Sequence, residues 1–384
     1  MRTPNPNVKP EAAKKLIKDS IVVLAHTDLA ASDVDWRRES GDRNVLDKRH
    51  APTLRAGGAT VVCDHVGGDW RYGYLPATRL HTDSLQRFMR VLAHTYAEME
   101  ESEHFILATT TDDIRRAKRE NKIAFVICLE GGAPLDGELS YLRNYYRLGL
   151  RCFGLTHDVR NEVADGIRER NGGGLTHFGV TVVKECDRLG IVIDVSHMSD
   201  RGTDDVLETS TQPIIASHSN ARALCSHRRN LTDERIKGIA KTGGVIGFHC
   251  LDRLVSDKPG ATVEDVLRHI AYIADLVGTD HIGVGPDVME NWDPNIVNYM
   301  SERSSTINGI PQMHWKHGYP KGMSTNADLP DLTERMLKLG FTSEDVVKFL
   351  GGNFMRVFKK VWKPRGVEET TAPPRLAVQQ GGKR

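Results

Sequence analysis

The sequence lacks the features of several large classes of protein. No apolar run in its 384 residues approaches the roughly 20 residues that cross a bilayer. The formal net charge is only +1, so no basic excess indicates a nucleic-acid partner. Segment 1–19 is polar and contains four lysines, but it has no apolar core of the kind found in secretion signals. We therefore expect no membrane span, no nucleic-acid partner and a cytoplasmic protein.

The sequence also lacks paired cysteines, internal repeats and an obvious interdomain linker. Its six cysteines are scattered, and none forms a CxxC pair. Several stand inside apolar runs, which favours buried, reduced thiols over disulfides or metal ligands. Hydrophobic residues make up 39% of the chain, enough for one large core. One domain is therefore the simplest organisation.

The chain does contain eight short apolar runs separated by segments with helical patterning. The runs are 21–25, 59–63, 123–129, 152–156, 191–196, 213–217, 244–248 and 281–286. Each of them ends at a histidine, aspartate or glutamate. Eight β-type runs alternating with helices predict an α/β fold, a single (β/α)8 TIM-like barrel, in which chemistry lies at the C-terminal ends of the strands. Imidazoles and carboxylates gathered at one rim indicate a metal site.

Helical signals fill the gaps between these runs. Residues 85–96 place apolar side chains at helical spacing, and Thr262 begins another helix that stops at Gly278. A third helix is predicted to begin at Thr342 or Ser343 and to end at 351–352, a pair of glycines.

The boundaries follow from this pattern. We expect an N-terminal extension at 1–20, the barrel at 21–365 and a disordered tail at 366–384. The polar stretch 288–324 follows the last strand and carries several aromatic residues. A loop of this length in a barrel is expected to act as a substrate lid or a subunit contact.

His26 and Asp28 stand two residues apart at the end of the first run. Side chains at i and i+2 of a strand point the same way, so both can bind one zinc or similar divalent ion. The same tripeptide recurs at 81–83, but there it precedes a helix and follows no strand, so a capping role explains it.

Three further residues at strand ends complete the candidate metal site. Glu130 follows an almost wholly apolar run, where an unpaired carboxylate is costly, and it can bridge two metals. His197 and His218 end successive runs in near-identical surroundings, Val-Ser-His and Ala-Ser-His. Packing alone does not explain two histidines at equivalent points, so we interpret both as ligands.

Other polar residues at the same rim have possible catalytic roles. Asp287 can move a proton between a water and a leaving group. His157 can stabilise an oxyanion, and Arg229 can bind a substrate carboxylate. The roles of His249 and His65 stay open between structural support and the site.

These residues together resemble the membrane dipeptidase (renal dipeptidase, M19) family of zinc peptidases. The resemblance covers about residues 20–360. The matching segments are 26–29 (HTDL), 129–132 (LEGG), 155–157 (LTH), 190–199, 216–220 (ASHSN), 229–233 (RNLTD), 243–244 and 351–353 (GGN).

The resemblance implies a binuclear metallopeptidase with two Zn2+ ions per chain. His26 and Asp28 would hold one ion, His197 and His218 the other, and Glu130 would bridge them. A hydroxide shared by the ions would attack the amide bond of a dipeptide. Catalysis would involve Asp287 as proton carrier, His157 at the oxyanion and Arg229 at the terminal carboxylate. The family also implies a homodimer.

One departure from the family leaves the substrate open. The family commonly reads Asp-Phe-Asp-Gly at its last motif, whereas Asp287 is followed here by Val288, Met289 and Glu290. The alternative is hydrolysis of another small amide, such as an N-acyl amino acid, a lactam or a modified dipeptide. A third hypothesis is a descendant that binds without catalysis, although every expected site residue is present. In a related deaminase the first metal-binding motif would more often be His-x-His, whereas here it is His26-Thr27-Asp28.

Overall fold

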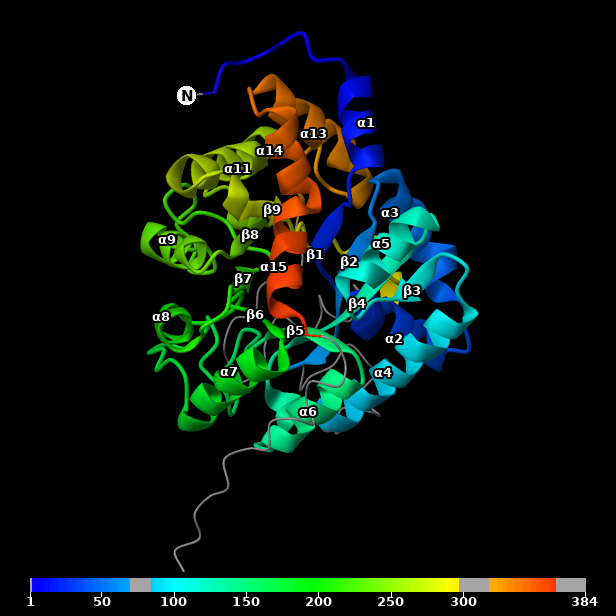
Figure 1. Cartoon of the computed structure of the whole chain (residues 1–384), viewed down its shortest axis with the longest axis vertical. Coiled ribbons are helices and arrows are strands. Elements are labelled where there is room, and N and C mark those ends of the chain that lie inside the picture. The colour runs from blue at the N-terminus through cyan, green and yellow to red at the C-terminus, as the bar shows by residue number, and fades with distance from the viewer. Residues whose placement is uncertain (1, 70–83, 297–317, 364–384) are drawn as a thin grey trace, which may run out of the picture.

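The computed structural model describes residues 2–69, 84–296 and 318–363. Its centre is a parallel sheet in the order β1-β2-β4-β5-β6-β7-β8-β9, in which β9 comes back beside β1, so that the barrel nearly closes (Figure 1). The strands are β1 (Val23–Thr27), β2 (Val61–Gly68), β4 (Ile123–Glu130), β5 (Leu150–Gly154), β6 (Val192–Asp194), β7 (Ile215–Ala216), β8 (Val245–Phe248) and β9 (Ile282–Val284). This architecture confirms the predicted (β/α)8 barrel. A further short strand, β3 (Phe105–Leu107), pairs with β4 and was not predicted.

Helices cover the outside and one end of the barrel. They are α1 (Pro10–Asp19), α2 (Asp35–Glu39), α3 (Ala51–Ala56), α4 (Ser84–Glu101), α5 (Thr111–Arg119), α6 (Leu139–Arg147), α7 (His177–Leu189), α8 (Asp200–Thr209), α9 (Asp233–Lys241), α10 (Asp252–Val255), α11 (Val263–Val277), α13 (Leu329–Lys338), α14 (Ser343–Val347) and α15 (Asn353–Val361). None of the described helices combines the length and apolar character that crossing a membrane requires.

Two of the three predicted helices are confirmed. The helix expected over 85–96 is α4, and α11 begins at Thr262 with a capping box to Asp265 and ends at Gly278. The third helix was predicted to end at 351–352, and this prediction was wrong. Gly351 leaves the helical conformation, with φ 178° and ψ −13°, but the chain resumes a helix at once as α15. The glycine pair is a kink between two helices.

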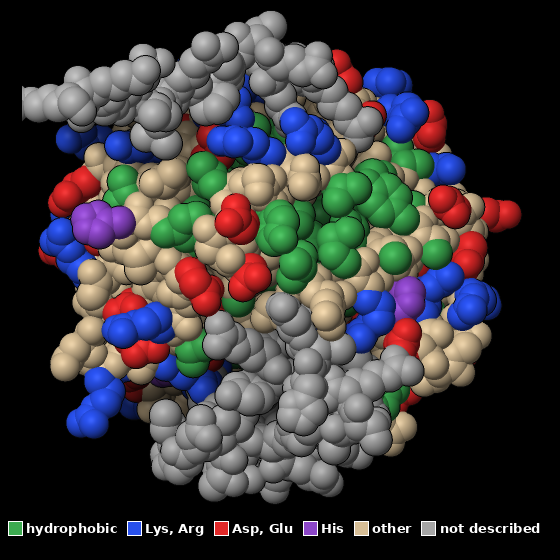
Figure 2. Space-filling view, turned by 90° about the horizontal axis from the view of Figure 1, so that it is seen from below, with side chains coloured by type: hydrophobic (Ala, Val, Ile, Leu, Met, Phe, Trp, Pro, Cys, Tyr) green, Lys and Arg blue, Asp and Glu red, His purple; other side chains and the backbone are tan. Residues whose placement is uncertain are grey.

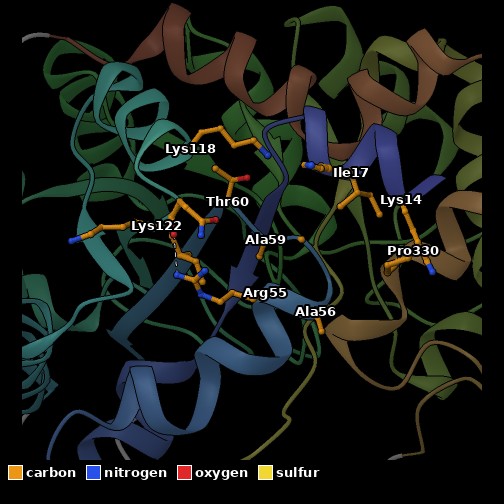
Figure 3. Close-up of a pocket in the computed structure, with 13 residues that line it drawn as sticks. Lys14, Ile17, Arg55, Ala56, Ala59, Thr60, Lys118, Lys122 and Pro330 are labelled. Carbon is orange, nitrogen blue, oxygen red and sulfur yellow. Dashed lines mark hydrogen bonds between the residues drawn. The ribbon is translucent and has the colours of Figure 1, made fainter. Parts of the chain in front are cut away.

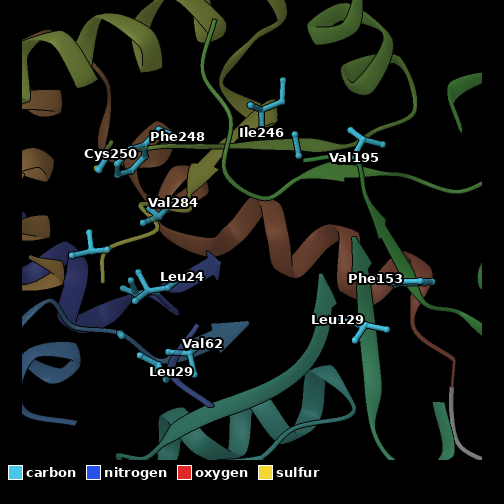
Figure 4. Close-up of a cluster of buried hydrophobic side chains, with 14 of the residues drawn as sticks. Leu24, Leu29, Val62, Leu129, Phe153, Val195, Ile246, Phe248, Cys250 and Val284 are labelled. Atoms are coloured by element: carbon cyan, nitrogen blue, oxygen red, sulfur yellow. The ribbon is translucent and has the colours of Figure 1, made fainter. Parts of the chain in front are cut away.

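Side-chain alternation divides the core into two layers. Outward-facing strand residues such as Leu24, Phe153 and Ile246 pack under the helices (Figure 4). Inward-facing residues form a second cluster that includes small side chains, among them Ala25, Ala124 and Cys152. All six cysteines are buried and unpaired, which confirms the prediction of reduced thiols.

Helix α15 closes the lower end of the barrel. Phe354 and Phe358 pack with the inward-facing strand residues, and the Phe358 ring stacks on Trp362 with centroids 4.4 Å apart. Gly283 of β9 permits this packing, because a Cβ there would stand 2.3 Å from Phe354 Cε2. These rings fill the barrel interior at the end where the strands begin.

The predicted segments beyond the barrel fall partly within the described residues. The N-terminal extension contains α1, which packs against α13. Within the long segment 288–324, residues 297–317 lie outside the described part, as does the predicted tail.

The face seen from below carries acidic and basic side chains around a group of hydrophobic ones (Figure 2).

We predict that Phe354→Ala lowers the free energy of unfolding by about 3–5 kcal/mol, because it removes a fully buried ring and leaves a cavity. Urea denaturation measures the change. Val347→Ala is the matched control, because that side chain is 40% exposed. A loss no larger than the control's would contradict the role assigned to α15.

Candidate metal centre

The predicted metal ligands converge at the open end of the barrel. His26, Glu130 and His218 offer ligand atoms that all lie within 4.8 Å of one another, and the same holds for Glu130, His157 and His197. Asp28 joins them through His26, whose Nε2 lies 3.3 Å from Asp28 Oδ2. The five predicted ligands, separated by up to 192 positions in the chain, therefore meet at one place, and His157 lies beside them.

Glu130 stands at the centre of this group. It continues the inward-facing series of β4, and in the sheet register it lies beside Gly154 of β5. Its Oε1 atom is 3.3 Å from His197 Nε2 and 3.8 Å from the Nε2 atoms of both His26 and His218. That oxygen is buried and accepts no hydrogen bond among the described residues.

The tautomers of His197 and His218 follow from their partners. His197 Nδ1 donates to Asp158 Oδ1 at 2.8 Å. Burial opposes ionisation of Asp158, but the imidazoles of His157 and His197 outweigh it and hold the pKa of that carboxyl well below its usual range. Ser217 Oγ donates to Asp194 and therefore accepts from His218 Nδ1 at 2.7 Å. Both histidines thus keep an unprotonated Nε2.

These two Nε2 atoms lie 2.9 Å apart. Two lone pairs that face each other repel, unless a cation lies beside both. Zinc binds imidazole nitrogen at about 2.0–2.1 Å, so two ligands of one tetrahedral ion are about 3.3 Å apart. The spacing around Glu130 Oε1 is of this size. The nitrogen and oxygen donors therefore fit a zinc-like ion. His197 and His218 each have the outer hydrogen-bond partner that metal sites commonly provide, whereas Nδ1 of His26 has none among the described residues.

Burial makes the carboxylates of the group reluctant to ionise. It raises the pKa of Glu130 well above the usual range, and the nearby charges of Asp28 and Asp287 add to the rise. Burial, followed by the charge of Asp287, raises the pKa of Asp28 to about 7. Bound divalent cations would reverse both shifts, because they favour the charged forms.

Asp287 and His249 form a pair beside the ligands. Leu251 N donates to His249 Nδ1, so His249 carries its proton on Nε2 and donates it to Asp287 Oδ2 at 3.2 Å. Burial opposes ionisation of Asp287, but the imidazoles of His26 and His249 outweigh it and lower the pKa of the carboxyl. The left-handed backbone of Asp287, with φ 55°, is a strained conformation typical of functional positions. His249 therefore supports the site through Asp287.

The other predicted residues also reach the site. The ring of His157 stacks on His197 with centroids 4.4 Å apart, and His65 stacks on His26 at 4.1 Å. Arg229 donates from Nη1 to Ser219 Oγ and from Nη2 to the carbonyl of His218, and its buried Nε has no hydrogen-bond partner among the described residues. The predicted binding of a substrate carboxylate by Arg229 stays a prediction.

Sequence reasoning missed the carboxylates that support these side chains. Asp194 accepts hydrogen bonds from Ser217 and from the backbone of Ser196. The sequence feature that could have identified it is its position as a charged residue within the apolar run of β6. Asp64 accepts from the backbone of Leu29 and Ala30 and so orders the turn after β1.

Asp69 is a third missed residue, and it holds the loop of His157. It accepts from His157 N and Ala133 N, each at 2.9 Å, and from Asn161 Nδ2. Gly131, with φ +118°, permits the approach, since a Cβ there would stand 2.2 Å from Asp69 Cγ. The Glu-Gly-Gly motif therefore combines a ligand position with space for this carboxylate.

The two ends of the barrel have different cavities. The one at the candidate metal centre has a volume of about 200 Å³ and is lined by His26, Asp28, Glu130, His197 and Asp287, among others. A larger cavity of about 340 Å³ lies near the beginnings of β1, β2 and β4 (Figure 3). Five lysines and arginines line it, but none of its described lining residues is a histidine, cysteine or carboxylate. The metal chemistry therefore belongs to the smaller cavity.

The chain is similar to known proteins over most of its length. The family model described as membrane dipeptidase (peptidase family M19) matches residues 10–293. An uncharacterized dipeptidase of Schizosaccharomyces pombe is 33% identical over 258 residues, which are 65% of this chain and 56% of that protein. The chain thus matches a little over half the length of that relative.

Solved structures share the fold along nearly the whole chain. An amidohydrolase from Pseudomonas aeruginosa superposes with a TM-score of 0.77 at 26% identity, covering 91% of this chain and 99% of that one. A metallo peptidase from Rhodobacter sphaeroides, liganded with a phosphinate mimic of the dipeptide L-Ala-D-Ala, has a TM-score of 0.72 at 22% identity, covering 90% and 100%.

We predict that Asp69→Ala speeds amide hydrogen exchange in residues 155–161 and lowers the free energy of unfolding by about 2–4 kcal/mol, because it leaves buried N–H donors unsatisfied. Exchange followed by mass spectrometry measures the local effect. The control is Asp205→Ala, which removes an acceptor of Leu175 N away from the site. Unchanged exchange in 155–161 would show that Asp69 does not hold this loop.

Proposed function

The chain belongs to the membrane dipeptidase family, peptidase family M19, and on that premise we propose that it is a zinc-dependent dipeptidase. The observation that carries the proposal is the convergence of unprotonated imidazole nitrogens and buried carboxylates on Glu130 Oε1, within a cavity of dipeptide size. The proposed reaction is hydrolysis of the amide bond of a small dipeptide.

We propose two zinc ions per chain. His26 and Asp28 would hold one ion, His197 and His218 the other, and Glu130 would be shared between them. When bound, such ions act as Lewis acids and make water acidic enough to supply a nucleophile near neutral pH. The outer partners Asp158 and Ser217 keep the two histidines in the ligand tautomer.

Asp287 is the proposed proton carrier. His249 holds its Oδ2, so Oδ1, which lies 3.6 Å from His26 Nε2, is the oxygen that can exchange a proton. A lowered pKa keeps this carboxyl ionised at neutral pH, ready to accept a proton from the attacking water. Oδ1 would then return the proton to the leaving amine.

His157 and Arg229 are proposed to position the substrate. Burial lowers the pKa of His157, so its imidazole is neutral near pH 7 and can donate to an oxyanion without a charge of its own. The free Nε of Arg229 points to a buried site for the terminal carboxylate of the substrate. A terminal carboxylate bound at a fixed distance from the amide would restrict the substrate to dipeptides.

We predict that the purified protein supplied with zinc hydrolyses L,L- or L,D-dipeptides, that a chelator abolishes turnover and that added zinc restores it. Released amino acids are measured by chromatography. Hydrolysis of N-acyl amino acids with no cleavage of any dipeptide would favour the second candidate, a hydrolase of another small amide. The homodimer and the cytoplasmic location stay predictions from the sequence.

Asp287→Asn is expected to lower kcat about 100-fold or more, because a neutral amide cannot accept the proton. Steady-state kinetics with a dipeptide measures the loss, and retained zinc shows that the centre is intact. Asp257→Asn, an exposed carboxylate on a neighbouring loop, is the control. A kcat within a few-fold of the unmodified enzyme would remove Asp287 from the proposed role.

A further inference from the structure

Four arginines line the cavity at the candidate metal centre: Arg168, Arg228, Arg229 and Arg253. Three of them have partners within the protein. Arg168 forms an ion pair with Asp158 at 2.8 Å, Arg228 donates to the carbonyl of Ile167, and Arg229 donates to His218 and Ser219. The fourth, Arg253, forms no such contact with the described residues.

Arg253 has a charged side chain with no partner in the described part of the chain. Among the described residues its guanidinium forms no ion pair and no hydrogen bond, and its Nε is buried and unsatisfied. Burial lowers its pKa to about 10, which still leaves it protonated at neutral pH. A buried cationic donor without an acceptor is costly, so this position favours an anionic ligand.

The surroundings of Arg253 strengthen such an interaction. It lies on α10, directly after β8, and apolar side chains of Ile167, Leu251 and Leu254 line the same cavity. Charge-assisted hydrogen bonds gain strength where water is excluded. The positive charges of Arg253 and Arg229 both lower the pKa of His227, after burial, so the three groups share one electropositive region.

We propose that Arg253 binds a side-chain carboxylate on the C-terminal residue of the substrate, so that the enzyme selects dipeptides ending in aspartate or glutamate. This inference rests on the proposed dipeptidase function. Arg229 supplies the donor for the terminal carboxylate, and the second carboxylate of the same residue lies only one or two methylene groups away. Two neighbouring cations, each with a free donor, suit such a pair of anions.

The test compares substrates that differ by one charge at constant shape: Ala-Asp with Ala-Asn, and Ala-Glu with Ala-Gln. In the zinc-loaded enzyme we expect kcat/KM to favour the acidic member about tenfold or more, as for a charge-assisted hydrogen bond to a desolvated group. Arg253→Met should abolish this ratio by lowering kcat/KM for the acidic members more than for Ala-Asn and Ala-Gln, and Arg253→Lys should restore part of it. Arg201→Met, an exposed arginine outside the cavity, is the control.

Several results would overturn the inference. They are an acidic preference that survives Arg253→Met, a preference for an acidic N-terminal residue instead, and an equal loss for Ala-Asp, Ala-Asn and Ala-Ala. Absence of turnover for every dipeptide would count against the proposed function rather than Arg253. Calorimetric binding of Ala-Asp and Ala-Asn to Asp287→Asn protein, with and without Arg253→Met, decides the inference in that case.

Discussion

The contact between His197 and His218 governs the arrangement of the whole site. Their Nε2 atoms face each other at 2.9 Å, and both lack a proton because Nδ1 of each ring donates elsewhere. This arrangement is unfavourable without a cation. Glu130 adds a buried oxygen 3.3 Å from His197 Nε2 that no donor satisfies in the described chain. The folded protein therefore holds together groups that a divalent ion would stabilise.

The barrel supplies the energy to hold these groups together. Each ligand lies near or just after the end of a strand whose residues are buried, so the ligand cannot move away without disturbing the core. Helix α15 fills the lower interior, and the polar layer lies above it, with Glu130, Gly154 and Asp194 in register across three strands. The outer carboxylates Asp158 and Asp194 then orient the two histidines.

The sequence predicted the barrel and the meeting of its ligands because both depend on a local pattern. An apolar run followed by a histidine or carboxylate marks the end of a strand, and parallel strands of a barrel end at one rim. The predictions failed where distant contacts decide the outcome. The glycines at 351–352 have the signature of a helix end, but the next helix follows at once and packs Phe354 against Gly283, a contact that no local pattern indicates. Asp69 carries no signal in its neighbours, since Ala133, His157 and Asn161 reach it from far along the chain.

The central claim is that this constellation binds two metal ions through five protein ligands. X-ray diffraction from crystals of the zinc-loaded protein, with anomalous maps recorded on both sides of the zinc absorption edge, tests it most directly. The account predicts two anomalous peaks flanking Glu130, one beside His26 and Asp28 and the other beside His197 and His218. A single peak, or peaks that leave Glu130 without contact to either ion, would contradict it.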